Sequence, residues 1–425
     1  MFTTKNYKKN LISLLNFFIS LMPLSLIVGN LFTNINIIIV SLLGLFLYGR
    51  KIFSLEKKTY QYLIYLFFFY LIITTFFNNW QFFNEYNSYS ENFLKSIFYL
   101  RFLVFFLVVY TMIETKEFNT KLFFLSCAFF SLVISFDIVF QVIFKKNIIG
   151  YTISLNRPSS FFGNENIAGG YIQRFILFFI FYISLKKKFT LSYLTILFII
   201  FSTVIIVTGN KMPAAIFIFT FFSYLLIKKK IKYLLVSFFT VFIVVFALMK
   251  DNPTKRMHID YAIFVHDAIE IFKNSPKLFY YNRDNEIKEW NSGYLTHFNS
   301  GVQMWKKNKL FGSGLKSFRL KCSYDSNQTC NTHPHNYVIE IVVDTGLFGL
   351  TIIYTIVVLG SINFIKYYLK EIDYDKKFIT IIFFILVLAE FFPIRSSGSF
   401  FTTSNSSYIF LILPIFLNIK KLNKL

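Results

Sequence analysis

Long apolar stretches, separated by short polar segments, recur along the whole chain. A run of about 18 or more apolar residues can cross a bilayer as an α-helix, because a helix satisfies its own backbone polar groups. The pattern predicts an all-α polytopic membrane protein with about 12 transmembrane helices. We expect one multi-span membrane domain over residues 1–425. The predicted spans cover roughly residues 10–29, 31–49, 60–77, 94–113, 121–143, 166–185, 190–208, 212–227, 232–249, 336–361, 378–394 and 403–419.

Short clusters of basic residues lie between these apolar stretches. They comprise Lys5, Lys8 and Lys9; Arg50, Lys51, Lys57 and Lys58; Lys186 to Lys188; Lys228 to Lys230 with Lys232; Lys366, Lys370, Lys376 and Lys377; and Lys420, Lys421 and Lys424. Lys and Arg are enriched in the cytoplasmic loops of membrane proteins. With the N-terminus inside, every cluster is cytoplasmic and the acidic loop 78–93 is outside. We therefore expect both termini to be cytoplasmic.

Residues 250–335 form the one long polar segment, and the predicted topology places it on the outer face. A structureless loop of this length is unusual, so we expect a small folded or membrane-lying module in this large periplasmic loop. Within it, residues 300–319 carry apolar side chains at helical spacing. This pattern predicts an interfacial helix that ends at Gly312 or Gly314.

The composition agrees with a membrane protein and argues against a nucleic-acid partner. The chain is 55% hydrophobic and 21% aromatic, with a formal net charge of +23. A nucleic-acid-binding protein gathers its basic residues into one patch or stripe. Here they flank the apolar runs instead, so membrane lipids are the expected partners of these charges.

Two of the three cysteines lie in the outer loop. Cys322 and Cys330 are close in sequence, and an oxidising compartment permits a disulfide between them. Two unpaired thiols are the alternative. Cys127 lies within an apolar span and is expected to fill the core.

Polar residues that do not resemble lipid anchors share the outer side of the predicted topology. Arg157, Lys211, His333, His335, Asn336 and Arg395 are expected at or near the outer interface, whereas Arg101, Arg174, Glu340, Asp344 and Glu390 lie within spans. Charges inside a membrane are costly, and they usually pair or line a hydrated site. An ion pair of Asp344 with Arg174 or Arg101 is expected, with either a structural or a functional role. Lipid phosphates are the alternative partners of Arg157 and Lys211.

The sequence His-Pro-His-Asn opens the tenth predicted span. Pro334 suits the first turn of a helix, so the helix is expected to begin near His333 and to hold His335 on its first turn. The positive end of the helix dipole then favours anions and keeps an imidazole neutral, as a general base requires. The pattern His-x-His also occurs in metal sites, but few further ligands lie nearby in the sequence.

These residues resemble a known family. His335-Asn336, nine further residues, and then Gly346-Leu347-Phe348-Gly349 are similar to the H-N-x9-G-x-x-G signature of the O-antigen ligase and polymerase superfamily. "RPSSFFGNENIAGGYI", which begins at Arg157, resembles the Arg-containing segment of that superfamily. "GNKMPAA" resembles its Ser-Arg-Gly turn, with Lys211 where Arg is usual. Lys offers phosphate a point charge, whereas Arg offers two parallel hydrogen bonds.

The resemblance implies a bacterial inner-membrane glycosyltransferase with a periplasmic active site. Its donor is expected to be a glycan on undecaprenyl pyrophosphate, transferred with inversion and without metal, nucleotide or other cofactor. The implied general base is His335, and the implied pyrophosphate-binding cations are Arg157, Lys211 and Arg174. Asn336, His333, Arg395, Asp344 and Glu340 are expected to support them.

Two activities within the superfamily share these motifs. A ligase of lipopolysaccharide biosynthesis transfers the glycan to lipid A–core, and we favour this reading because the spacing of the histidine motif fits it closely. A polysaccharide polymerase transfers the glycan to a second, growing glycan. A transporter of lipid-linked glycans is the alternative from another class, but its charged residues are expected to line a cavity open to both sides, whereas these gather at one face.

Overall fold

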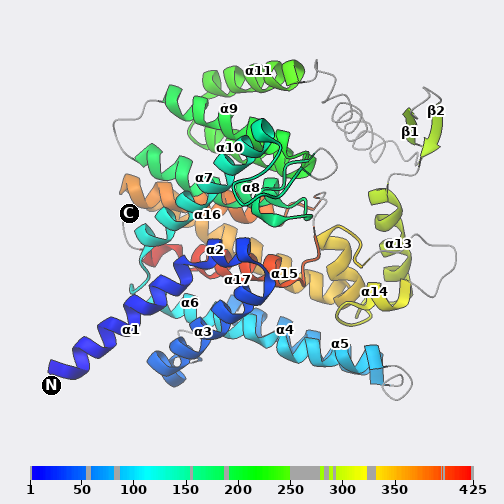
Figure 1. Cartoon of the computed structure of the whole chain (residues 1–425). Coiled ribbons are helices and arrows are strands. Elements are labelled where there is room, and N and C mark those ends of the chain that lie inside the picture. The colour runs from blue at the N-terminus through cyan, green and yellow to red at the C-terminus, as the bar shows by residue number, and fades with distance from the viewer. Residues whose placement is uncertain are drawn as a thin grey trace. The chain divides into compact units, whose positions relative to one another are not determined.

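The computed structural model describes residues 2–53, 59–80, 87–153, 157–185, 191–248, 278–281, 287–290, 293–322, 332–393, 395 and 398–422 (Figure 1). The chain divides into two compact units. Unit 1 comprises Met1–Ser126 and His297–Leu425, and unit 2 comprises Cys127–Thr296. Two helices, α7 (Thr120–Phe144) and α13 (Gly293–Lys307), carry the chain across the boundaries between the units.

Unit 1 is built from apolar helices contributed by both ends of the chain. Its further helices are α1 (Phe2–Ser20), α2 (Met22–Val28), α3 (Asn30–Tyr48), α4 (Thr59–Asn79), α5 (Asn87–Phe98), α6 (Leu100–Glu114), α14 (Ser317–Lys321), α15 (Tyr337–Lys370), α16 (Tyr374–Glu390) and α17 (Thr403–Leu417). α15 packs along α4, and α6 packs against both α3 and α17. Elements far apart in sequence therefore form one core.

Aromatic side chains fill much of that core. The rings of Phe68, Tyr99 and Phe102 all contact Phe410, with ring centroids between 5.1 and 6.1 Å apart. These residues come from α4, the break before α6, α6 itself and α17. Aromatic pairs at such distances add to the free energy gained by burying apolar area. Part of the high aromatic content therefore serves helix packing.

Unit 2 is also mainly helical. It contains α8 (Ala168–Leu185), α9 (Leu191–Val207), α10 (Lys211–Ile227) and α11 (Ile231–Leu248). α9 packs against α8, α10 and α11. Strands β1 (Leu278–Tyr281) and β2 (Ile287–Trp290) form an antiparallel pair, with Leu278 opposite Trp290.

All twelve apolar segments predicted from the sequence contain helix. Among the described residues, five helical segments are long and apolar enough to span a membrane, or six when the bent pair α1–α2 is counted as one span. This supports the prediction of a helical membrane protein. The full set of twelve spans and their orientation stay predictions.

Several helix boundaries follow from local chemistry. Pro23 lies in the first turn of α2, where its missing N–H is tolerated, and α1 and α2 meet at a bend of 44°. The outer-loop helix differs from the sequence prediction, because α13 ends at Lys307 and the chain then leaves helical geometry before Gly312. Gly312 and Gly314 both have positive φ angles and shape a turn instead.

Candidate active site

Helix α15 is interrupted at Gly346, and the loop that follows α13 binds at the interruption. Gly346 has φ +66° and ψ −173°, a conformation almost confined to glycine. The amides of Leu347 and Phe348 consequently donate to the carbonyl oxygens of Lys309 and Leu310, at 2.9 and 3.1 Å. These bonds join the Gly-rich end of the histidine motif to the loop at residues 308–317.

The carboxylate of Asp344 organises the rest of this loop. Asp344 is fully buried and accepts hydrogen bonds from the amide of Lys316 at 2.7 Å, the amide of Ser317 at 3.2 Å and the hydroxyl of Ser317 at 2.9 Å. The amides of Ser313 and Gly314 donate to the carbonyl oxygens of Val343 and Asp344, both at 2.8 Å. Asp344 thus fixes a loop conformation.

The predicted ion pair of Asp344 with Arg101 is wrong, whereas the pair with Arg174, which lies in the other unit, stays a prediction. The guanidinium of Arg101 donates to Asn34 and to the carbonyl oxygen of Phe98 instead. A carboxylate can accept several backbone N–H groups, and these donors compensate its charge without a cation. The loop that supplies them comes from about 30 residues upstream, and sequence spacing alone did not reveal this partner.

Asn336 joins two segments at the N-terminal end of α15. Its Oδ1 accepts from the amide of Ile339 at 3.0 Å, and this makes it the N-cap of the helix. Its Nδ2 donates to the carbonyl oxygens of Pro393 at 2.9 Å and Arg395 at 3.0 Å. The Asn of the motif is therefore a positioning residue.

Arg395 lies in a buried ion pair. Its Nη1 is 2.7 Å from Oε2 of Glu390, and the exposed fractions of the two side chains are 7% and 1%. The hydroxyl of Tyr337 donates to the other carboxylate oxygen of Glu390 at 3.0 Å. Arg395 therefore holds the end of α16 beside the start of α15. The sequence analysis had not paired Arg395 with Glu390.

Glu340, in the first turn of α15, is also buried and hydrogen-bonded. Its two carboxylate oxygens accept from the hydroxyl of Ser399 and the amide of Phe400, both at 2.5 Å. The segment between α16 and α17 is thus bound to α15 through both Asn336 and Glu340.

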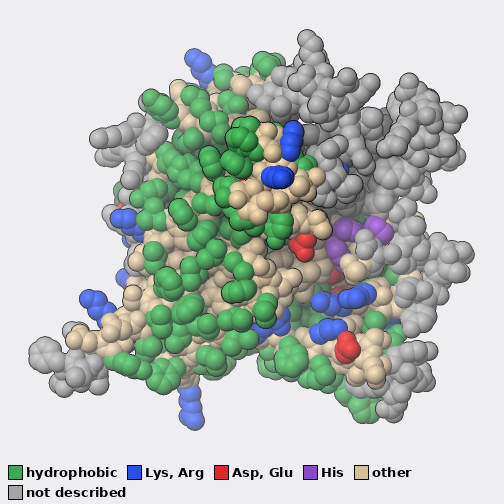
Figure 2. All heavy atoms as spheres, in the orientation of Figure 1, with side chains coloured by type: hydrophobic (Ala, Val, Ile, Leu, Met, Phe, Trp, Pro, Cys, Tyr) green, Lys and Arg blue, Asp and Glu red, His purple; other side chains and the backbone are tan. Residues whose placement is uncertain are grey.

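Three histidines gather at the N-terminal end of α15. The ring of His335 lies 4.1 Å from that of His333 and 5.3 Å from that of His297, measured between centroids. Figure 2 shows the histidine side chains together on one face of the molecule. The sequence analysis had not selected His297, which comes from α13.

Close helix packing brings His297 to this place. Gly301 lies one turn after His297, on the same face of α13. A β-carbon at Gly301 would clash with Ile339 and would lie 3.1 Å from Pro334, so only glycine permits this approach. Three of the chain's five histidines lie within residues 297–335. This clustering in the sequence was a weak signal that His297 belongs with the other two.

The predicted start of the helix is wrong. α15 begins at Tyr337, with Asn336 as its cap, and not near His333. His335 precedes the cap and has φ +56°, in the left-handed region. Its ring therefore stands beside the helix N-terminus, not on the first helical turn. Pro334 is buried, which fixes the chain between the two flanking histidines.

His333 is partly buried and has one satisfied ring nitrogen. Its Nδ1 lies 2.9 Å from the hydroxyl of Thr332, whereas its buried Nε2 has no hydrogen-bond partner among the described residues. Burial lowers the pKa of His333, and the nearby imidazole of His297 lowers it further. His333 is thus favoured in its neutral form.

The cations predicted for donor binding lie in unit 2. A β-carbon at Gly209 would be 3.2 Å from Cδ and Nε of Arg157, so this side chain crosses the turn directly before Lys211. Lys211 is the first residue of α10. Arg174 lies within α8 and is partly buried. The structure therefore brings Arg157 to the α9–α10 turn.

Cys322 takes part in a disulfide bond, whereas Cys127 is a free, buried thiol. The predicted partner, Cys330, lies outside the described residues, so this pairing stays a prediction. In the described part of the chain, no group of three or more His, Cys, Asp or Glu side chains has a geometry suited to a metal ion.

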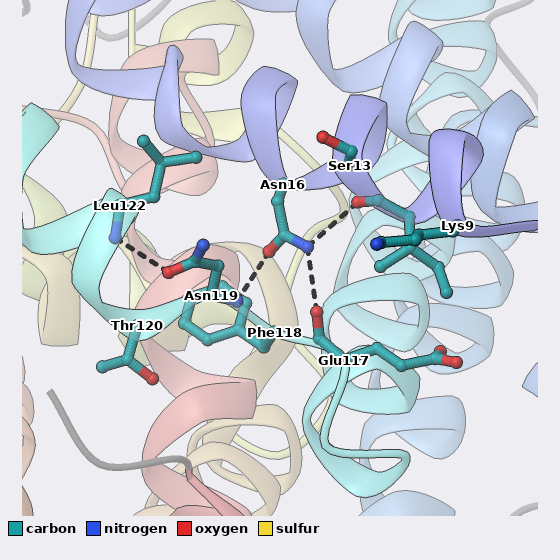
Figure 3. A pocket seen from close by; sticks show the side chains of 9 residues that line it. Lys9, Ser13, Asn16, Glu117, Phe118, Asn119, Thr120 and Leu122 are labelled. Carbon is teal, nitrogen blue, oxygen red and sulfur yellow. Dashed lines mark hydrogen bonds between the residues drawn. The ribbon is translucent and has the colours of Figure 1, made fainter. Parts of the chain in front are cut away.

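A separate cavity of about 380 Å³ lies between α1 and the start of α7 (Figure 3). Asn16 borders it and donates to the carbonyl oxygen of Glu117 at 2.9 Å, while its Oδ1 accepts from the amide of Asn119 at 2.7 Å. The cavity contains none of the residues predicted for chemistry. In the predicted topology it opens toward the cytoplasm.

Residues 195–354 match a family model described as O-antigen ligase. This match supports the O-antigen ligase superfamily. The resemblance predicted from the histidine motif is thereby confirmed, and the matched segment includes Lys211, the three clustered histidines and Asp344. The superfamily indicates glycosyl transfer of the ligase or polymerase type with lipid-linked glycan substrates. No curated protein sequence matches the chain.

Proposed function

We propose that this protein transfers a glycan from undecaprenyl pyrophosphate to lipid A–core at the periplasmic face of a bacterial inner membrane. The observation that carries the proposal is the histidine cluster at the outer end of α15, inside the segment that matches the O-antigen ligases. The acceptor, the orientation and the choice of ligase over polymerase belong to this proposal.

In the proposed reaction His335 acts as the general base. Its ring nitrogen takes the proton of the attacking acceptor hydroxyl, and the hydroxyl oxygen forms the new bond to the anomeric carbon. The bond between that carbon and the pyrophosphate oxygen breaks, and its electron pair leaves with undecaprenyl pyrophosphate. Attack from the face opposite the leaving group inverts the anomeric centre. The pyrophosphate carries its own activation, so the step requires neither a nucleotide nor a metal ion.

Two features support His335 as the base rather than His333. The ring of His335 contacts both other histidines, so it occupies the centre of the cluster. Its left-handed backbone is fixed by buried Pro334 on one side and the doubly anchored Asn336 on the other. A base must be held within hydrogen-bond reach of the proton that it accepts, and these anchors supply that rigidity.

Arg157, Lys211 and Arg174 are proposed to neutralise the leaving pyrophosphate. Negative charge grows on the phosphate oxygens as the glycosidic bond breaks, and fixed cations lower the barrier most when they face the developing charge. We expect Arg157→Ala and Lys211→Ala to weaken donor use. Lys211→Arg should retain activity, because a guanidinium can bind the same phosphate oxygens.

The test is glycan transfer by purified protein reconstituted in lipid, with two acceptors offered separately: lipid A–core and a second lipid-linked glycan. His335→Ala should lose at least about a hundredfold in rate, since general-base assistance is worth roughly 10²–10⁴. His333→Ala is the matched control and should lose only a few-fold. EDTA should leave the activity unchanged.

Near-wild-type turnover of His335→Ala would show that His335 is not the general base. Transfer to the second lipid-linked glycan alone would change the assignment to a polymerase. A tag inserted at residues 186–190 should lie in the cytoplasm. Its detection in the periplasm would contradict the proposed orientation and the periplasmic position of the site.

A further inference from the structure

Asp137 is a fully buried carboxylate of α7 that the sequence analysis had not selected. It lies within the predicted span 121–143. A charge inside a membrane span is costly, so such a residue usually pairs with a cation or belongs to a functional site. The partners of Asp137 in the described part of the chain are a backbone amide and a hydroxyl, both from the segment between α7 and α8.

Both carboxylate oxygens of Asp137 hold that segment. Oδ1 accepts from the amide of Ile148 at 2.9 Å, and Oδ2 accepts from the hydroxyl of Ser160 at 2.6 Å. Gln141 lies one turn further along α7 and on the same face. Its Oε1 accepts from the amide of Ser160 at 2.9 Å, and its Nε2 donates to the carbonyl oxygen of Tyr151 at 3.2 Å. Two side chains of α7 therefore anchor both ends of the segment.

Ser160 is fixed more firmly than its neighbours in sequence would require. Its φ is +55°, in the left-handed region that a residue other than glycine adopts only where the surrounding structure enforces it. Its carbonyl oxygen accepts from Nδ2 of Asn147 at 3.0 Å, so its amide, hydroxyl and carbonyl groups are all bonded. These bonds determine the direction of the chain at Ser160.

The anchored serine lies three positions after Arg157. Pro158 follows Arg157 directly, and a proline restricts its own φ angle and the backbone of the residue before it. Pro158 and Ser159 are both buried. The connection between Ser160 and Arg157 is therefore short and stiff, and the position of Ser160 determines that of Arg157.

The side chain of Arg157 crosses the turn between α9 and α10, directly before Lys211. A β-carbon at Gly209 would lie 3.2 Å from both Cδ and Nε of Arg157. The turn itself packs tightly on α8, because a β-carbon at Gly169 would collide with the hydroxyl of Thr208. The guanidinium of Arg157 consequently meets a fixed turn, and its own segment must be held in place for it to do so.

We propose that Asp137 is a positioning residue. By anchoring Ser160 it places the guanidinium of Arg157 beside Lys211, where the two cations receive the pyrophosphate of the lipid-linked donor. All four residues belong to unit 2. A planar guanidinium binds phosphate through two parallel hydrogen bonds, so its affinity depends on its orientation as well as on its charge. The proposal rests on the proposed function, in which Arg157 binds the donor.

The first measurement is the binding of a fluorescent undecaprenyl pyrophosphate to purified protein in phosphatidylcholine nanodiscs. Asp137→Ala and Arg157→Ala should each weaken binding by about tenfold, the usual effect of losing one charge-assisted contact. Because Asp137 acts through Arg157, the variant with both replacements should bind no more weakly than Arg157→Ala alone. Independent effects, with a loss of about a hundredfold in the double variant, would overturn the proposal.

Three further variants separate positioning from folding. Asp137→Asn should bind within about threefold of wild type, because its amide can accept from Ile148 and donate to Ser160. Ser160→Gly adopts the left-handed conformation without strain and loses only the hydroxyl, so it should fold and yet bind the probe more weakly. Ser135→Ala is the matched control, since this buried hydroxyl of α7 bonds to the carbonyl oxygen of Ser131 within the same helix. Wild-type binding by both Asp137→Ala and Ser160→Gly would overturn the proposal.

A disulfide trap reports the position of Arg157 without any ligand. Cγ of Arg157 lies 3.3 Å from the place of a β-carbon at Gly209, so the paired replacements Arg157→Cys and Gly209→Cys put two sulfurs within bonding reach. In this background Asp137→Ala should slow disulfide formation by copper phenanthroline about tenfold, because a freer segment lowers the effective concentration of one sulfur beside the other. Ser135→Ala should leave the rate unchanged.

The trap and the binding cycle fail in different ways. An unchanged rate of disulfide formation in Asp137→Ala would overturn the positioning role. Wild-type probe binding by Arg157→Ala, together with slower disulfide formation in Asp137→Ala, would refute the donor site of the proposed function and leave the positioning of Arg157 standing.

Discussion

The side-chain amide of Asn336 donates to the carbonyl oxygen of Arg395 at 3.0 Å, while the oxygen of the same amide caps α15. One side chain therefore joins the helix that follows the histidines to the segment that follows α16. The histidine motif gains its rigidity from this contact, because His335 is the immediate neighbour of Asn336.

Exchange of the Asn336 amide for a carboxylate tests this relationship. Asn336→Asp retains the capping oxygen but loses both donors and places negative charge beside two carbonyl oxygens. We expect a loss of about 1–3 kcal/mol in stability, together with lower transfer activity. Asn119→Asp is the matched control, because Asn119 caps α7 through its oxygen and a carboxylate suits a helix N-terminus. Thermal unfolding in detergent measures both, and equal stability of the two variants would contradict the role of the amide donors.

The ion pair of Arg395 with Glu390 should be far more sensitive to single than to double replacement. Glu390→Leu leaves a buried guanidinium without a counter-charge, which costs about 3–5 kcal/mol. The double variant Glu390→Leu with Arg395→Met should recover most of that loss, because no charge remains buried. A double-mutant cycle of unfolding free energies measures the coupling. Glu91→Gln, in the exposed pair with Lys95, should change stability by less than about 1 kcal/mol.

Stability should fall on acidification through His333. Its pKa is lowered by burial and by His297, so the folded protein binds the proton less well than the unfolded chain does. The folded state is therefore most stable above the unfolded pKa of about 6.5 and loses stability as the pH falls through the folded value. Among the described residues, the ring of His335 lies beside that of His333, and His297 acts on its charge. Between pH of about 7.5 and about 5.5, the unfolding temperature of wild type should drop more than that of His333→Asn. An identical drop in both proteins would contradict a contribution from His333.

The break in α15 should require glycine at position 346. Any side chain there is strained by the φ of +66°, and its β-carbon would collide with the carbonyl group of Leu310. We expect Gly346→Ala to lose at least about 1–3 kcal/mol and to release the loop that holds Lys316. Gly170→Ala is the control, since its β-carbon meets nothing closer than 3.7 Å and alanine favours a helix. Limited proteolysis of the loop at residues 308–317 reports its release.

The helical segments of this protein follow directly from its sequence. A run of apolar residues forms helix in a membrane for a local reason, which is that each backbone N–H must bond within the run. The predicted segment 212–227 therefore coincides closely with α10, and 378–394 overlaps most of α16. The histidine motif could also be recognised from the sequence, because its residues lie within fifteen positions of one another.

The first residue of α15 could not be predicted from the nearby sequence. Pro334 and Asn336 are both favourable near a helix N-terminus, and the sequence alone does not rank them. Tertiary contacts selected Asn336, because its amide also reaches Pro393 and Arg395, nearly sixty residues away. His335 consequently stands before the cap.

The partners of the buried charges were decided by the tertiary structure alone. Asp344 binds a loop that lies almost thirty residues upstream, and His297 reaches His335 only because Gly301 lets α13 approach α15. A carboxylate is satisfied equally well by an arginine or by backbone amides, so its residue type does not reveal which it meets. The sequence therefore determines where helices form and which residues carry charge, whereas the packing of distant segments determines which of those charges meet.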